Sequence, residues 1–559
     1  MATTAHHHTP HISADTHVTL AADTNQARGI AEYALAFMHG PVHAGPANDG
    51  GGAGPRGLGI GEPDASVREK TNLFHTDACI CGVSALALGT NAPTLLRAEA
   101  LRYAAPAAGF GSLGAKIKAA GTSLGTSGAT VFGSTAKVMP EKAIVANCAA
   151  VREWDSNGTN FGYNPTLGHV AGEFGHNDFY PVAIAAAQLA GEDGEFALRG
   201  MILLDEIRGR LAEVFSLKTY KIDHVLHGAI ASAATYGAML GASVDQIESA
   251  IGMVVAHHVP FRAIRAGKQL SDSKGSSAAI STEAAIVAMQ RSMHGFLGPR
   301  DIFRNPEAVF CLFQKPPEKG MSPFNLILAR AGSDFAVMGM HFKLGLYEHQ
   351  SAGALQATLD LLRRNPALLE DKNAGRISKI RIVAYEPAFG IIGDPAKMDP
   401  RTRQSADHSM AYIVATLLRR ALESGSSDWA KNMLLPADYG PEAIFNPLTR
   451  AIMKKITFVH GGPEYDRRYP EGIPTSVVIT DDRGTDHDSG LVMFPTGHAR
   501  NTSADLRGLL KHKFSMLGAL AVENAPALVT RLSAIEKKSV GEIADLYNFS
   551  IKTAAKPFD

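Results

Sequence analysis

The densest group of chemically active side chains in the sequence lies between Val151 and Tyr180. This stretch runs from the end of one predicted helix, through a loop rich in glycine, asparagine and proline, to the start of the next. A carboxylate brought close to an imidazole in this way is suited to proton transfer, and a helix N-terminus attracts anions. The alternative is that Asp155 and His176 only cap helix ends. The residues of this stretch that could take part in such chemistry are Asp155, His169, His176, Asn177 and Asp178.

Further along the chain, basic or imidazole side chains stand where predicted helices begin. Helix N-terminal N–H groups combined with cations form a good receptacle for carboxylates. The histidine spacing matches no metal-binding motif, and His257 and His258 lack the separation that places two ligands on one helix face. The pattern favours acid/base chemistry on a polycarboxylate, with neither a metal nor a cofactor. The residues near these helix starts are His224, Arg262, Lys274, Lys343, His349, His408 and Tyr412.

Composition narrows the classes of partner. The chain has 559 residues, 45% of them hydrophobic, so it can form large cores. Its 54 basic residues balance its 54 acidic ones, which argues against nucleic acid or an anionic membrane surface as a partner. Four cysteines in so long a chain indicate a reducing compartment. Without an apolar run of roughly 20 residues or a secretory pattern or presequence, we expect a soluble protein of the cytoplasm, or of a mitochondrial matrix.

Hydrophobic periodicity predicts a mainly α protein with an α+β part. Residues 1–25 have the composition of a disordered tail. A large helical domain is predicted over 26–317, interrupted by a flexible Gly/Pro-rich loop at 40–63. An α+β lid domain is predicted over 318–500, and amphipathic helices over 501–559 are predicted to return to the helical domain. The cleft between two such domains is a common place for an active site.

Several element boundaries carry local signals. Ser243 and Gln246 form a capping box that starts a helix, and Gly241 ends the helix before it. Ile377–Tyr385 alternates charged and apolar residues, as is typical of a half-buried strand.

Six short motifs, in a fixed order along the chain, resemble the MmgE/PrpD family. The resemblance implies a helical domain with an inserted α+β lid, a homodimer, and a metal-independent active site at the domain junction. By position it implies that the active-site residues are Asp155, His176, His224, Lys274, His349 and Tyr412. The motifs are Trp154-Asp155-Ser-Asn-Gly-Thr, Gly175-His176-Asn-Asp, Ile222-Asp-His224-Val, Lys274-Gly-Ser-Ser-Ala-Ala, Phe342-Lys343 with Tyr347-Glu-His349-Gln, and Ala406-Asp-His-Ser-Met-Ala-Tyr412.

The implied reaction removes water from a small tricarboxylate, 2-methylcitrate, to give 2-methyl-cis-aconitate. The proton next to a carboxylate is weakly acidic, so cations must hold that carboxylate and stabilise the enolate-like charge. Lys274, Lys343 and Arg262 are predicted to form this clamp, and Asn177 and His408 are predicted as further substrate contacts.

The acid and the base are also predicted from residue type. A neutral histidine is suited to be the base near pH 7, and a second histidine or a tyrosine can protonate the departing oxygen. We assign His176 as base or acid, oriented by Asp155. His349 and Tyr412 are the predicted partners from the lid.

The chain also departs from the family pattern. Asn157 and Gly158 stand where further aspartates are usual, and the spacing around His224 leaves His224 and His227 as alternatives. Dehydration is favoured because the surroundings of His224 and His349 resemble that branch. The alternatives are decarboxylation of cis-aconitate, another lyase or epimerase reaction on a polycarboxylate, and a non-catalytic ligand-binding homologue.

Overall fold

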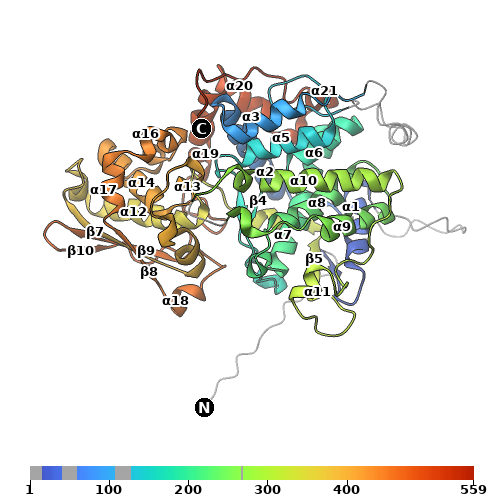
Figure 1. Cartoon of the computed structure of the whole chain (residues 1–559), viewed down its shortest axis with the longest axis horizontal. Coiled ribbons are helices and arrows are strands. Elements are labelled where there is room, and N and C mark those ends of the chain that lie inside the picture. Colours follow the sequence, from blue (N-terminus) through green and yellow to red (C-terminus); the bar gives the residue numbers. More distant parts are fainter. Residues whose placement is uncertain (1–15, 41–59, 107–127, 266–268, 559) are drawn as a thin grey trace, which may run out of the picture.

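The computed structural model describes residues 16–40, 60–106, 128–265 and 269–558. They form a helical domain and a smaller α+β lid that lies beside it (Figure 1). This confirms the predicted mainly α fold with an α+β part. The helical domain contains α1 (Gln26–His39), α2 (Ala65–Ala87), α3 (Asn91–Ala100), α5 (Pro140–Arg152), α6 (Pro181–Ala190), α7 (Gly194–Val214), α8 (Val225–Met239), α9 (Val244–His257), α10 (Asp272–Met293) and α11 (Val309–Phe313).

The central helix of this domain is α8, and all of its residues are buried. It packs against α6, α7, α9 and α10. Small side chains permit this close approach: a Cβ atom added to Gly237 would lie 2.5 Å from Sδ of Met289 on α10. His224 directly precedes α8, so the packing of this helix fixes the position of that imidazole.

The lid is built on a four-stranded sheet with the strand order β10-β9-β7-β8. Strand β7 (Ile377–Ala384) pairs parallel with β8 (Ile456–His460) and antiparallel with β9 (Thr475–Asp481). Strand β9 turns back into β10 (Asp486–Asp488). The lid helices are α12 (Ala352–Arg364), α13 (Arg403–Ala406), α14 (Met410–Ser424), α15 (Trp429–Asn432), α16 (Pro441–Ile444), α17 (Pro447–Met453) and α18 (Pro463–Asp466).

After the lid, the chain packs on the helical domain. Helix α19 (Leu506–Ala521) lies on α2, α20 (Ala525–Leu532) contacts both of these helices, and α21 (Val540–Ala544) contacts α6. The chain enters the lid near Phe342 and leaves it near Gly497. These two connecting segments are hydrogen-bonded to each other, since the backbone N–H of Phe342 donates to the carbonyl of Gly497 at 2.9 Å.

Two segments differ from the sequence predictions. His17–Leu20, predicted to belong to a disordered tail, forms β1 and pairs antiparallel with β5 (Leu326–Ala329). Local composition could not reveal this strand, because its partner lies far along the chain. Strand β5 and the short helix η4 (Ala336–Gly339) pack on α7, although the lid was predicted to begin at residue 318.

The predicted flexible loop at 40–63 lies largely outside the described residues, as do residues 1–15 of the predicted tail. The end of the loop is described: β2 (Glu62–Pro63) pairs parallel with β6 (Ala331–Gly332). This pairing attaches the start of α2 to the segment that leads toward the lid.

Among the helices that the structure describes, none alone is long and apolar enough to cross a membrane. Helices α2 and α3 reach the required length and composition only as a pair, and they meet at 92°. Most residues of α2 are buried inside the fold.

Candidate active site

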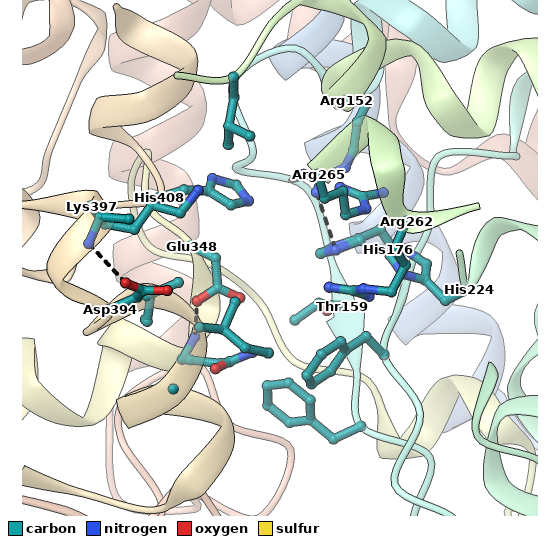
Figure 2. Close-up of a pocket in the computed structure, with 18 residues that line it drawn as sticks. Arg152, Thr159, His176, His224, Arg262, Arg265, Glu348, Asp394, Lys397 and His408 are labelled. Carbon is teal, nitrogen blue, oxygen red and sulfur yellow. Dashed lines mark hydrogen bonds between the residues drawn. The ribbon is translucent and has the colours of Figure 1, made fainter. Parts of the chain in front are cut away.

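A cavity of about 300 Å³ lies between the helical domain and the lid (Figure 2). Figure 2 shows Arg262 and His176 on one side of the open space and Glu348 and Lys397 on the other. The charged and imidazole side chains that line the cavity are Arg152, His176, His224, Arg262, Arg265, Glu348, Asp394, Lys397 and His408. Both domains therefore contribute groups that can bind anions or move protons.

His176 lies in a two-residue strand, and its side chain lines the cavity. Its strand, β4 (Gly175–His176), pairs with β3 (Thr159–Asn160). Nε2 of His176 lies 3.2 Å from the guanidinium of Arg152, which can only donate, so Nε2 accepts and Nδ1 carries the proton. Burial and the Arg152 charge hold the pKa of His176 well below its ordinary value. Nδ1 has no hydrogen-bond partner among the described residues, so a neutral imidazole keeps an N–H available.

His224 is the second buried imidazole of the cavity wall, and its ring centroid lies 5.4 Å from that of His176. Neither ring nitrogen has a hydrogen-bond partner among the described residues. Burial lowers its pKa strongly, although the nearby Asp223 carboxylate opposes this. His227, the other candidate from the sequence, is also buried but does not line the cavity. The structure thus brings His224, and not His227, to the site.

Asp155 lies behind the cavity wall, fully buried in a cage of cations. Its carboxylate forms ion pairs with Arg152 and Lys343, and it lies 3.6 Å from Nζ of Lys274 and 3.2 Å from Nε2 of His408. Burial opposes ionisation, but the positive charges outweigh it and hold the pKa of Asp155 well below its ordinary value. Its backbone φ is +50°, a region that residues other than glycine rarely adopt. Asp155 organises the cations rather than facing the open space.

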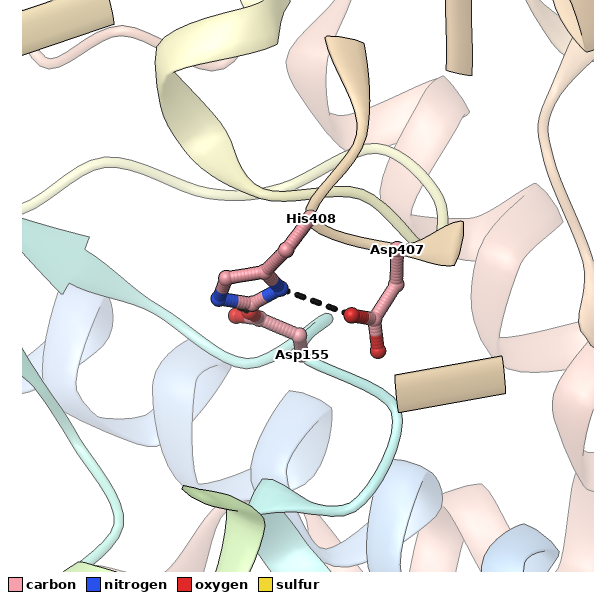
Figure 3. A group of neighbouring side chains, drawn as sticks. All are labelled: Asp155, Asp407 and His408. Carbon is pink, nitrogen blue, oxygen red and sulfur yellow. Dashed lines mark hydrogen bonds and ion pairs between the residues drawn. The ribbon is translucent and has the colours of Figure 1, made fainter. Parts of the chain in front are cut away.

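His408 lines the cavity. Its ring also lies beside the carboxylates of Asp155 and Asp407 (Figure 3). Its Nδ1 lies 2.7 Å from Asp407, whose carboxylate also pairs with Nζ of Lys274 at 3.1 Å. Burial and the Lys274 charge lower the pKa of His408 to about 4, despite its two carboxylate neighbours. Lys274, predicted as part of a substrate clamp, is instead neutralised by buried carboxylates.

The trio in Figure 3, Asp155, Asp407 and His408, has donor atoms within 4.8 Å of one another, a spacing that could hold a metal ion. Both carboxylates already face ammonium or guanidinium groups, so a divalent cation there would have to overcome their positive charges. The trio fits an ion-pair network better than a metal site.

Glu348 is a lid residue of the cavity that sequence reasoning did not assign to the site. Its backbone N–H donates to the carbonyl of Asp407 at 2.9 Å, and its carboxylate accepts from the N–H of Gln350 at 2.8 Å. Burial, together with the Asp155 charge, raises the pKa of Glu348 to about 7. The residue stands directly before His349 in a motif that was noticed for its histidine. An acidic residue at the start of a helix was the available signal.

Six of the ten residues that the sequence placed in the site do not line the cavity: Asp155 and Lys274, described above, and four more. The His349 ring lies beside the rings of His341, at 5.2 Å, and Phe161, at 5.6 Å, behind the cavity wall. The Tyr412 hydroxyl donates to the carbonyl of Asp438 at 2.6 Å, inside the lid. Tertiary packing turns these side chains away from the space between the domains. The other two are Asn177, which accepts from Asn157 at 3.1 Å, and Lys343, which pairs with Asp155.

Three cations line the cavity in addition to Arg152. Arg265 forms an ion pair with Asp223. One terminal nitrogen of Arg262 has no hydrogen-bond partner among the described residues, and burial lowers the pKa of this side chain. Lys397, which sequence reasoning also missed, ends a short lid helix, η8 (Pro395–Lys397). This set of cations suits a ligand with several carboxylates.

Two family models match the chain over most of its length. The model of the MmgE/PrpD N-terminal domain matches residues 103–321, and that of the MmgE/PrpD C-terminal domain matches residues 348–534. The first range contains the cavity residues from Arg152 to Leu270, and the second contains those from Glu348 to His408. The matched regions therefore include both walls of the cavity.

Proteins similar to this chain include several dehydratases. A 2-methylcitrate dehydratase of Salmonella typhi is 24% identical over 441 residues, which cover 75% of this chain and 85% of that protein. An alkylcitrate dehydratase of a fungal species is 23% identical over 317 residues, covering 55% of this chain and 58% of that protein. A mitochondrial 2-methylcitrate dehydratase of Yarrowia lipolytica is 26% identical over 309 residues, covering 54% and 55%.

Proposed function

This chain belongs to the MmgE/PrpD family, and from that premise we propose that it is a hydro-lyase that removes water from 2-methylcitrate or a related 2-alkylcitrate. The observation that carries the proposal is a carboxyl group with a pKa of about 7, Glu348, in a cavity that also holds neutral imidazoles and several cations. The similar dehydratases support the reaction type.

The cations provide the binding energy and stabilise the developing charge. We assign Arg262 and Lys397 to the carboxylates of the substrate, whereas the charge of Arg265, in the same cavity, is already paired with Asp223. Removal of a proton next to a carboxylate builds enolate-like charge on that carboxylate, and cations fixed in a buried site stabilise this charge more than water does. The buried cage around Asp155 holds Arg152 and His408 in position.

Glu348 transfers the proton, and His176 stabilises the leaving group. The Glu348 carboxylate takes the proton from the carbon next to the substrate carboxylate, since a base with a pKa near the working pH is the most effective. The Nδ1–H of the neutral His176 donates a hydrogen bond that stabilises the departing hydroxide. The proton that Glu348 has taken passes to this hydroxide, so Glu348 is ionised again. One C–H bond and one C–O bond break, a C=C bond forms, and water leaves.

A direct assay tests the proposal. Purified protein is mixed with 2-methylcitrate in the presence of a chelator, and the ultraviolet absorbance of a new conjugated double bond is followed, with the product identified by mass spectrometry. We expect 2-methyl-cis-aconitate. Release of carbon dioxide and itaconate from cis-aconitate, without dehydration of 2-methylcitrate, would replace the proposal with a decarboxylase.

Replacing Arg262 by Gln is expected to raise KM for 2-methylcitrate by about 10- to 100-fold, with a smaller effect on kcat. The reason is that one charge-assisted hydrogen bond to a carboxylate is lost in both the ground state and the transition state. Steady-state kinetics of the variant measure this. Arg300→Gln removes an exposed arginine and serves as the control with unchanged KM. An unchanged KM in Arg262→Gln would remove this residue from the clamp.

The rate should also depend on pH through Glu348. Its carboxyl group has a pKa of about 7, so it is protonated and inactive as a base below that pH and ionised above it. We therefore expect log kcat/KM to rise with pH up to about 7 and then level off. Residual activity of Glu348→Gln should lack this rise. A wild-type rate that instead declines above pH 7 would make Glu348 the acid.

A further inference from the structure

Part of the cavity lining is apolar. The apolar side chains that line it include two neighbouring rings, Phe161 and Phe174, together with Leu270, Ile391 and Ile392. The first three are at most 8% exposed, so they are built into the fold rather than lying on its surface. A ligand that fills the cavity must place some part of itself against this apolar wall.

The two phenylalanines are held firmly in place. Their rings meet edge to face, with centroids 5.8 Å apart. Nζ of Lys218 lies 4.1 Å from the centroid of Phe174, and the ring of Tyr469, from the lid, lies 5.7 Å from that of Phe161. His349 lies beside Phe161 as well, which gives this histidine a positioning role behind the wall. A wall supported from both domains has a defined shape and can discriminate between ligands by size.

Unsubstituted citrate has no alkyl group that could pack against this wall. Its carboxylates and hydroxyl would lose hydration against aromatic rings without gaining hydrogen bonds, which is costly. An alkyl group gains free energy in the same place. We propose that the apolar wall is the seat for the alkyl substituent of a 2-alkylcitrate, and that Phe161 and Phe174 limit the length of that substituent. This inference rests on the proposed function and names the substrate class more closely.

Binding of the alkyl group against the wall also orients the carbon that reacts. In 2-methylcitrate the methyl group is attached to the carbon that loses its proton, because the product, 2-methyl-cis-aconitate, carries the methyl group on the double bond. Holding the alkyl group against the wall therefore fixes the orientation of the C–H bond that breaks. Glu348, which lines the same cavity, is the base for that bond. The wall therefore determines the position of the reacting carbon as well as the affinity for the substrate.

The test compares substrates of increasing length: citrate, 2-methylcitrate, 2-ethylcitrate and 2-propylcitrate. One methylene in a hydrophobic pocket changes kcat/KM by about tenfold or more. We expect wild-type protein to turn over 2-methylcitrate at least about tenfold more efficiently than citrate. In Phe174→Leu and Phe161→Leu, the ratio of kcat/KM for 2-propylcitrate to that for 2-methylcitrate should rise by about tenfold. Leucine keeps the wall apolar, so the variants test size and not polarity.

Phe310→Leu is the matched control, because Phe310 is equally buried but belongs to another aromatic cluster, with Phe303. It should leave the substrate ratio unchanged. The same ratio in wild type and in both wall variants, with turnover intact, would overturn this inference alone. No turnover of any citrate by the wild-type protein would overturn the proposed function, and this inference with it.

Discussion

Replacing Glu348 by Gln is expected to lower kcat for 2-methylcitrate by about 100- to 10,000-fold, the range that a general base contributes. Glutamine has the same shape and can still accept a hydrogen bond from the N–H of Gln350. It cannot take a proton, so the loss should appear in kcat and much less in KM. Steady-state kinetics, together with a thermal melt to show that the variant is folded, measure this effect.

The control for this variant is Glu370→Gln, which removes an exposed carboxylate that pairs with Arg376 on the lid surface. It should keep wild-type kinetics. If Glu348→Gln kept more than about a tenth of the wild-type kcat, Glu348 would not be the base. The neutral imidazole of His224, whose ring nitrogens have no hydrogen-bond partner among the described residues, would then be the next candidate.

Replacing Asp155 by Asn is expected to destabilise the protein by about 3–5 kcal/mol, because it leaves buried cations without their counter-charge. Asp155 is fully buried and pairs with Arg152 and Lys343, with Lys274 at 3.6 Å. Because Lys343 belongs to the segment that leads into the lid, the contact between the domains should weaken. Denaturant unfolding, followed by circular dichroism, gives the change in the free energy of unfolding.

Two further variants distinguish the loss of the buried Asp155 charge from a nonspecific loss of stability. Asp360→Asn removes a carboxylate from an exposed pair with Arg363 and should cost no more than about 1 kcal/mol. The double variant Asp155→Asn with Lys343→Met removes one uncompensated cation together with the carboxylate, so it should recover part of the stability lost in Asp155→Asn. A single variant as stable as the wild type would show that the cage does not depend on the Asp155 charge.

The fold could be predicted from the sequence because its signals are local. The capping box of Ser243 and Gln246 is present at the start of α9, and the alternating segment at Ile377 forms strand β7. Backbone hydrogen bonding and the burial of apolar faces follow from residues close together in the chain. His17–Leu20 was missed for the converse reason: this strand is formed by pairing with residues about 310 positions away.

The candidate site was only partly predictable. His176, His224, Arg262 and His408 do line the cavity, and their types and helix-start positions were the signal. The sequence by itself determined the two-domain architecture and the supply of imidazoles and cations near the domain junction. Only the tertiary structure decided which charges are neutralised, which side chains face the cavity, and that Glu348 has a pKa of about 7. The physical reason is that ion pairing and desolvation depend on distances between groups far apart in the chain, such as Lys343 and Asp155, which are 188 residues apart.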